Sequence, residues 1–480
     1  MKRTVLLYVV ALVLFASGVT AVLHFGRGMK PPAGPAEIQE PRAAHPPATP
    51  SIWSALQENS HDPVSRLLIQ FIVVVLATRG VGWLFSRVGQ PSVIGEMTAG
   101  ILLGPSLFGW LWPAGFSFVF APDSLGTLRL FSQIGVCIFM FVVGLELDVS
   151  QLRDKAHAAV VVSHAGIMLP FLLGVSASLL MFPSLAAPGA TFTGFALFMG
   201  IALSITAFPV LARILKERGI EKTFLGTTAL TCAAVEDATA WSVLAFVVAI
   251  VRATGLASTF LSLALVAAFV LILLGGVRPL LNRWVHESSE DREPGRGVIA
   301  GVLVFMSACA LATELIGIHA LFGSFLAGVV MPRKRSFREE LTLRLGGFGT
   351  IFLLPLFFAF SGLRTHVGLL NDAKSWFIAL GIICIAVAGK LGGCMITARI
   401  VGLSWLDSFS LGALMNTRGL VELIALNIGY DLGILPPRIF TMMVLMALAT
   451  TFMAGPLLNV AEWLRRRVVV NPPYGVAAAQ

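Results

Sequence analysis

Apolar stretches of about 20 residues recur along almost the whole chain, and only short polar loops separate them. A stretch of this length crosses a bilayer as an α-helix. Of the 480 residues, 57% are hydrophobic and only 12% are charged, whereas soluble domains carry about 25% charged residues. The pattern therefore predicts an all-α polytopic membrane protein that is surrounded by a lipid bilayer.

The first 63 residues differ from the rest of the chain. Residues 1–25 place Lys2 and Arg3 before an apolar core, which is typical of either a signal peptide or an uncleaved signal anchor, and the sequence leaves both open. Residues 26–63 contain a Pro-rich segment that favours an extended linker outside the membrane. We expect a membrane domain over residues 64–467 and a short cytoplasmic tail over residues 468–480.

Hydropathy predicts thirteen spans after the linker, with the segment 297–332 as the place where one kinked element could replace two. Basic residues cluster in alternate loops, and the basic side of a membrane protein faces the cytoplasm. The linker is then outside and the C-terminus inside, as expected for a multi-pass protein of a bacterial inner (plasma) membrane. The expected spans are 66–86, 93–112, 128–147, 157–182, 193–217, 224–252, 257–284, 297–316, 318–332, 346–363, 375–400, 408–429 and 437–464.

The net charge of +9 has a topological explanation, because the basic residues sit at alternate ends of the apolar runs. Binding of nucleic acid is therefore not expected. The five cysteines all fall within apolar runs, and their spacing predicts neither a disulfide framework nor a metal cluster.

Two adjacent acids, Glu236 and Asp237, lie in the middle of the apolar stretch 227–250. A carboxylate at mid-membrane costs about 2.5–3.5 kcal/mol on insertion scales, and two neighbouring carboxylates also repel each other. Such a pair is expected where it faces a wet cavity and binds a cation or a proton. The alternative is that a buried base neutralises the acids and that they only hold helices together.

Two further segments predict interrupted helices. Pro209 lacks an N–H, so a helix through the fifth span loses a hydrogen bond, and the hydroxyls of Ser204 and Thr206 lie at the same level. In the twelfth span, Asn416 and Thr417 belong to a polar, weakly helical segment. The breaks are seven spans apart, so they run in opposite directions, as in secondary transporters with inverted repeats. A proline kink alone is common in membrane helices and would mean little.

Three charged residues near these segments could balance the partial charges of the half-helix ends, namely Lys390, Arg418 and Glu422. Lys390 lies deep in the eleventh span, and Glu236 is its natural partner by charge and depth. Alternatively, its long side chain reaches the interface.

Other polar residues in or near the spans receive structural interpretations. Arg364 is interpreted as an interfacial anchor rather than as part of an outer vestibule. Glu96 and Glu314 lack an obvious partner, Glu146 is close to the cytoplasmic edge, and His319 is interpreted as a structural histidine.

Several segments resemble the monovalent cation:proton antiporters of the second large branch, which includes Kef-type and NapA-type proteins, and the sequence is most similar to plant and yeast cation/proton exchangers and their bacterial relatives. The resembling segments span about residues 64–464 and are GEMTAGILLGPSLFG (95–109), MFVVGLELD (140–148), SITAFPVLARIL (204–215), EDATAW (236–241), PLFFAFSGLRT (355–365), AGKLG (388–392) and NTRGLVELIALNIGYDLG (416–433).

The resemblance implies a thirteen-helix fold with a core domain and a dimerisation domain, elevator-like alternating access and a homodimer. It implies that Asp237 carries the cation or the proton, that Lys390 pairs with the acids, and that Ser204 and Thr206 lie near the ion. The family usually has Asp or Asn where this chain has Glu236, so the stoichiometry stays open.

Residues and resemblance together predict a secondary antiporter that exchanges a monovalent cation (K⁺ or Na⁺) for protons, without a cofactor. A passive channel is a weaker alternative because no filter-like repeated loop occurs. A membrane-embedded enzyme would need a nucleophile–base pair or clustered metal ligands, and the scattered histidines supply neither. A non-transporting membrane sensor is the third alternative.

Overall fold

The computed structural model describes residues 2–26, 29, 62–146, 152–252, 256–287, 295–332, 334–347, 349 and 353–470. All regular elements within these ranges are helices, which confirms the predicted fold class. Almost all of the expected linker over 26–63, and most of the expected tail over 468–480, lie outside the described residues.

The helices follow one another with few long connections in the described ranges. In chain order they are α1 (Lys2–Gly26), α3 (Pro63–Arg87), α4 (Ser92–Leu103), α5 (Phe108–Leu111), α6 (Pro113–Val119), η1 (Pro122–Ser124), α7 (Leu125–Glu146), α8 (Leu152–Leu185), α9 (Phe192–Ser204), α10 (Phe208–Glu217), α11 (Phe224–Arg252), α12 (Leu256–Leu271), η2 (Ile272–Val277), α13 (Arg278–Glu287), α14 (Arg296–Ile316), α15 (Ala320–Val330), α16 (Arg335–Leu341), η3 (Thr342–Gly346), α17 (Leu354–Leu363), η5 (Val367–Leu369), α18 (Ala373–Val387), η6 (Ala388–Gly392), α19 (Gly393–Ile400), α20 (Trp405–Met415), α21 (Leu420–Asp431) and α22 (Pro437–Val470).

Nine helical stretches within the described residues are long and apolar enough to cross a membrane, and the pair α20–α21, bent by 43°, adds a tenth. The predicted thirteen spans are reached when α9–α10, α15 and α17, which are shorter, also cross. Between α14 and α15 the chain adopts positive φ angles at Gly317 (96°) and His319 (108°). The segment 297–332 is therefore two helices and not one kinked element.

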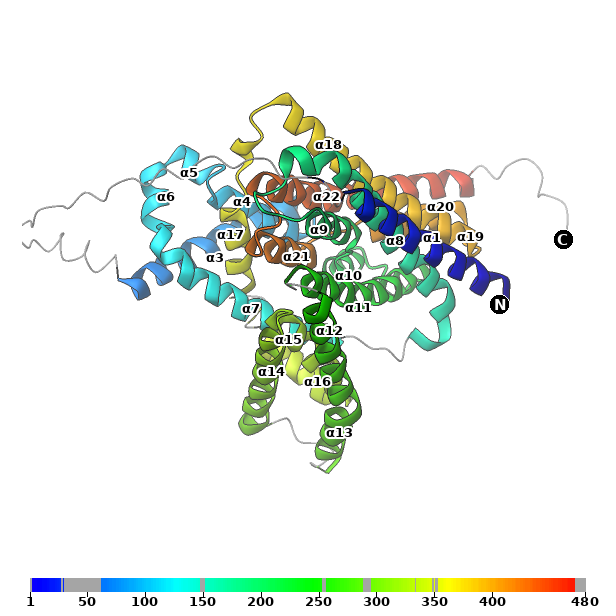
Figure 1. Cartoon of the computed structure of the whole chain (residues 1–480), viewed down its shortest axis with the longest axis horizontal. Helices are drawn as coiled ribbons and strands as arrows, with labels where there is room; N and C mark the ends of the chain where they lie inside the picture. Colours follow the sequence, from blue (N-terminus) through cyan, green and yellow to red (C-terminus); the bar gives the residue numbers. More distant parts are fainter. Residues whose placement is uncertain are drawn as a thin grey trace, which may run out of the picture.

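Two sets of helices pack around different neighbours (Figure 1). The broken-helix bundle contains α8–α11 and α18–α22, and each half of it has the order long helix, broken helix, long helix. The flanking bundle contains α3, α4, α7, α14, α15 and α17. In Figure 1, α13 and α14 extend away from the rest of the molecule, while α1 lies along α8.

Within the flanking bundle, α4 and α17 approach at backbone distance. A Cβ atom added to Gly362 would lie 2.0 Å from the backbone oxygen of Gly100, and a Cβ atom on Gly100 would lie 2.2 Å from the oxygen of Phe358. Only glycine fits at this crossing, because any side chain would overlap backbone atoms that cannot move independently. The contact fixes the position of α17, whose far end carries Arg364.

Candidate functional site

Both broken helices are interrupted near their middles, and the two interruptions touch. The first comprises Ile205 to Ala207, between α9 and α10. The second comprises residues 416–419, between α20 and α21. The N–H of Ala207 donates to the carbonyl of Thr417 over 3.1 Å, and the Thr206 hydroxyl donates to the carbonyl of Met415 over 2.9 Å. Pro209 lies in the first turn of α10, where its missing N–H costs no helical hydrogen bond.

Protein groups rather than lipid satisfy the exposed backbone of the second break. The Arg418 N–H donates to Thr451 Oγ1 over 2.8 Å, and the Thr451 hydroxyl donates back to the Arg418 carbonyl over 2.7 Å. Non-helical backbone survives at membrane depth only when it is buried in protein or lines a cavity. The α22 helix therefore stabilises the interruption in α20–α21.

The two predicted hydroxyl residues use their hydrogens on the backbone. The Ser204 hydroxyl donates to the carbonyl of Ile201 over 2.9 Å, and Thr206 bridges the two breaks as described above. Both side chains are fully buried. Their remaining contribution to a cation is the lone pairs of the hydroxyl oxygens, since a hydroxyl keeps acceptor capacity after donating.

Lys390 pairs with Glu236. The Lys390 Nζ lies 2.7 Å from Glu236 Oε2, and both side chains are fully buried. The same ammonium donates to the carbonyls of Ser204 over 2.5 Å and Gly166 over 3.0 Å. All three hydrogens of the ammonium thus have acceptors, which is the condition for tolerating a buried charge. The alternative in which Lys390 reaches the interface is wrong.

Two backbone features that the sequence did not predict accommodate this ion pair. Lys390 lies in a π-helical segment, Ala388–Gly392, and such segments are frequent at functional sites. On the facing helix α8, a Cβ atom on Gly166 would lie 2.6 Å from Glu236 Oε1. Gly166 therefore leaves room for the carboxylate and supplies a carbonyl to Lys390. The sequence alone does not distinguish Gly166 from other glycines in the spans.

Asp237 is as buried as its neighbour, with only 1% exposed, but no side chain pairs with it. The backbone N–H of Phe208, at the start of α10, is close to its carboxylate, and neither carboxylate oxygen accepts a well-formed hydrogen bond. Asn416, in the second break, is also fully buried with both side-chain polar atoms unpartnered. Leaving such groups unpaired costs about 1–3 kcal/mol each, and more for a charge. Orphaned oxygens next to a crossing of broken helices are suited to a positively charged substrate.

Arg418 and Glu422 are placed to offset helix-end charges. The guanidinium of Arg418 donates to the carbonyls of Ala202, over 2.7 Å, and of Leu203, both in the last turn of α9. Its Nη1 lies 3.5 Å from Glu422 Oε2, and Glu422 occupies the first turn of α21. The Arg418 guanidinium therefore faces the partially negative C-terminus of α9, and the Glu422 carboxylate lies at the partially positive N-terminus of α21. The helix dipoles favour both placements.

Two of the structural interpretations made from the sequence need correction. Arg364 is not only an interfacial anchor, because its guanidinium binds Asn427 Oδ1 over 2.7 Å and Asp431 Oδ1 over 2.6 Å on α21. Glu314 has a partner, since its Oε2 accepts from the N–H of Ala320 over 2.8 Å at the start of α15.

Comparison with known proteins decides the family. The sequence model described as "Sodium/hydrogen exchanger, transmembrane" matches residues 72–461. The chain belongs to the sodium/hydrogen exchanger family. It is similar to the Na⁺/H⁺ antiporter NhaS4 of Synechocystis, with 42% identity over 392 residues that cover 82% of this chain and 96% of the relative. This result confirms the resemblance inferred from the motifs, and the family consists of transporters rather than enzymes.

Other relatives of this exchanger-family chain are longer. It is 33% identical to the K⁺/H⁺ antiporter 1 of Saccharomyces cerevisiae over 83% of the chain but only 46% of the relative, so it spans about half the length of that protein. The solved structure of the sodium proton antiporter MjNhaP1 from Methanocaldococcus jannaschii covers 84% of this chain and 99% of its own, with a TM-score of 0.56 and 11% identity. At that identity the likeness shows the fold.

Proposed function

We propose that this membrane protein exchanges a monovalent cation for protons and that Asp237 holds either one in turn. The observation that carries the proposal is the contrast between the two adjacent acids. Glu236 is neutralised by Lys390, whereas both oxygens of Asp237 are buried and unpartnered. A proton or a cation removes the cost of that buried negative charge, so binding of the two is mutually exclusive.

Both broken helices contribute to the proposed site. Backbone at the two breaks, with the hydroxyl oxygens of Ser204 and Thr206, replaces part of the hydration shell of the cation. Asn416 adds an amide oxygen, which is an uncharged ligand for the cation. The relatives include Na⁺/H⁺ and K⁺/H⁺ antiporters, and one of them, GerN of Bacillus cereus, is a Na⁺/H⁺-K⁺ antiporter. The proposed substrate class is accordingly Na⁺ or K⁺.

Transport is proposed to follow elevator-like alternating access, in which the broken-helix bundle moves the loaded site relative to the flanking bundle within a homodimer. The proposed orientation in a bacterial inner membrane places the α14–α15 turn outside and the C-terminal end of α22 inside, because the basic loops alternate in that sense.

The proposal is tested in proteoliposomes that carry a pH gradient and a pH-sensitive dye. Addition of Na⁺ or K⁺ to the wild-type protein should dissipate the gradient, and Asp237→Asn should abolish this response while the protein remains folded. The matched control is Asp123→Asn, the same chemical change on a side chain that is 73% exposed. Normal cation-driven proton movement by Asp237→Asn would refute the assignment, and currents far above transporter rates would favour a channel.

A further inference from the structure

A cluster of charged side chains joins the two bundles at the end of the molecule proposed to face outward. Arg364 follows α17, in the flanking bundle, and binds Asn427 and Asp431 on α21. Arg129 of α7 also belongs to the flanking bundle, and its Nη2 lies 3.2 Å from Asp431 Oδ2. Asp431 therefore pairs with two arginines that come from two helices of the opposite bundle.

Further contacts hold Arg364 in place. Its guanidinium lies 4.2 Å from the ring centre of Phe360 and 4.7 Å from that of Tyr430. The Asn427 amide also donates to Ser361 Oγ over 2.8 Å. Only 12% of the Arg364 side chain and 20% of the Asp431 side chain is exposed. A stacked, largely buried arginine that binds both a carboxylate and an amide oxygen forms a stronger and more specific contact than an exposed surface ion pair.

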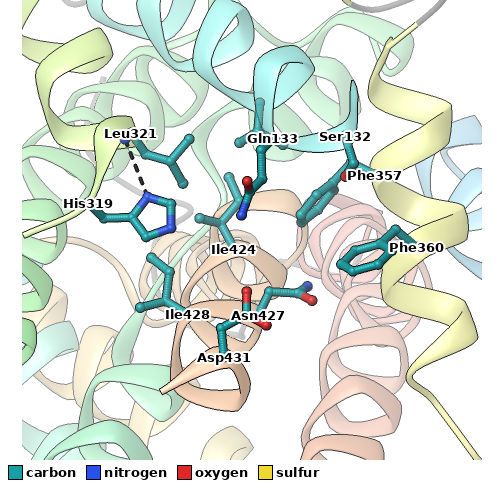
Figure 2. Close-up of a pocket in the computed structure, with 11 residues that line it drawn as sticks. Ser132, Gln133, His319, Leu321, Phe357, Phe360, Ile424, Asn427, Ile428 and Asp431 are labelled. Atoms are coloured by element: carbon teal, nitrogen blue, oxygen red, sulfur yellow. Dashed lines mark hydrogen bonds between the residues drawn. The ribbon is translucent and has the colours of Figure 1, made fainter. Parts of the chain in front are cut away.

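Directly inside this cluster lies a cavity of about 30 Å³ between α7, α15, α17 and α21, lined by Ser132, His319, Asn427 and Asp431 among others (Figure 2). It has space for about one or two water molecules. Figure 2 shows Asn427 and Asp431 projecting from α21 into this cavity, with Asn427 on the side of Phe360. The route along α21 from the outer face is therefore narrow.

The opposite end of the boundary has a larger cavity. A cavity of about 590 Å³ lies between the turn that joins α3 to α4 and the C-terminal parts of α10 and α22, with Gln90, Arg218 and Asn459 in its lining. Like the outer cavity, it lies on the boundary between the flanking bundle and the broken-helix bundle. The boundary is thus wide on the side proposed to be cytoplasmic and nearly closed on the other.

We propose that Arg364, Arg129 and Asp431 form the outer gate of the transporter. This inference rests on the proposed alternating access. Asp431 ends α21, whose other end begins at the second helix break. Moving the site to the outer face therefore requires α21 to separate from α7 and α17, and these ion pairs must break first. While these ion pairs are intact, they stabilise the conformation in which the outer end of the boundary is closed, so weakening them should make the outer side open more often.

Cysteine accessibility measures the gate without any transport. Ser132 lines the outer cavity and is only 1% exposed. In a background without the five native cysteines, Ser132→Cys is labelled with a membrane-impermeant maleimide from the outer side. Adding Asp431→Asn should raise the labelling rate about tenfold. The substitution removes charged hydrogen bonds that only the closed state makes, so it destabilises that state relative to the open one. Arg129→Gln, which removes the more exposed arginine, should raise the rate less.

Two controls make the result specific. Asp372→Asn breaks another ion pair proposed to lie at the outer face, with Arg438, but α18 and α22 both belong to the broken-helix bundle. It should leave the labelling rate of Ser132→Cys unchanged within about twofold. Asn459→Cys in the opposite cavity, labelled in inside-out vesicles, should react more slowly when Asp431→Asn is present, because the two conformations exchange population.

Equal labelling of Ser132→Cys with and without Asp431→Asn, together with an unchanged rate after Arg129→Gln, would overturn the gate. The milder variant Arg129→Gln covers the case in which Asp431→Asn fails to fold. The gate and the antiport can fail separately. Changed labelling in a protein that moves no protons in response to cations would refute the antiport alone, and normal antiport with unchanged labelling would refute the gate alone.

Discussion

The buried pair of Lys390 and Glu236 allows a quantitative test of how the site is stabilised. Replacing Lys390 with methionine keeps an unbranched side chain of similar length but removes three hydrogen bonds, to Glu236, Ser204 and Gly166. It also leaves Glu236 fully buried without its cation. Removing one partner of a buried pair costs about 3–5 kcal/mol. Extrapolating the size dependence of the entropy of unfolding to this chain, the unfolding midpoint should fall by about 3–5 °C.

The decisive measurement is a double-mutant cycle in detergent, with Lys390→Met, Glu236→Gln and the combination. Each single variant leaves one buried charge unpaired, whereas the double variant leaves none. The double variant should therefore lose less stability than the sum of the two single losses, with a coupling of about 2–3 kcal/mol. Additive losses would refute the pair as a stabilising unit, and a double variant more stable than wild type would show that the pair is retained for transport.

Three other predictions follow from packing and charge elsewhere in the chain. Gly362→Ala should destabilise the protein by about 1–3 kcal/mol, because its Cβ would meet the backbone of α4. Gly381→Ala, which has open space around it, should not destabilise the protein, and thermal unfolding of both variants checks the difference. A hydrogen bond from Ser375, and then the charge of Arg438, hold the pKa of Asp372 below its usual value near 3.9. The ionised carboxylate therefore stabilises the folded state above that pH, and this stabilisation is lost as the pH falls through the lower pKa of the folded state. Acid unfolding curves of Asp372→Asn should lack this pH-dependent contribution. The N-terminal helix α1 should remain in the mature protein as a further span, because Phe15 packs on Phe171 of α8 with 5.5 Å between the ring centres. Intact-protein mass spectrometry checks this, and a mature protein that lacks α1 would contradict it.

Local sequence signals sufficed for the broken helices and for the pairing of Lys390. Proline near a helix start and a polar, weakly helical segment have direct backbone consequences, and the structure is interrupted next to both of them. Lys390 was a lone cation among apolar residues, so charge and depth left few possible partners. Both inferences needed only the composition of one or two spans.

Arg364 and Gly166 show where such signals end. At the end of a span, an arginine that anchors a helix in the interface and one that binds another helix have the same local sequence. The partners of Arg364 lie 63 and 67 residues further along the chain, and only the packing of α17 against α21 reveals them. Gly166 likewise resembles any membrane-helix glycine until the carboxylate of Glu236 is seen beside it.

The division between the two acids has a consequence for coupling. If Asp237 is the exchange site, as proposed, then Lys390 and Glu236 compensate each other's charge, and Asp237 is neutral with either a proton or a monovalent cation bound. The unloaded site retains one negative charge, and moving it past apolar surroundings costs several kcal/mol more than moving either loaded form. On this proposal, the charge of the unloaded site by itself favours exchange over leakage. If Lys390 keeps its proton throughout, the cycle moves one proton per cation and transports no net charge, so an imposed membrane potential should leave its rate unchanged. A rate that follows the potential would mean that Lys390 itself releases its proton during transport.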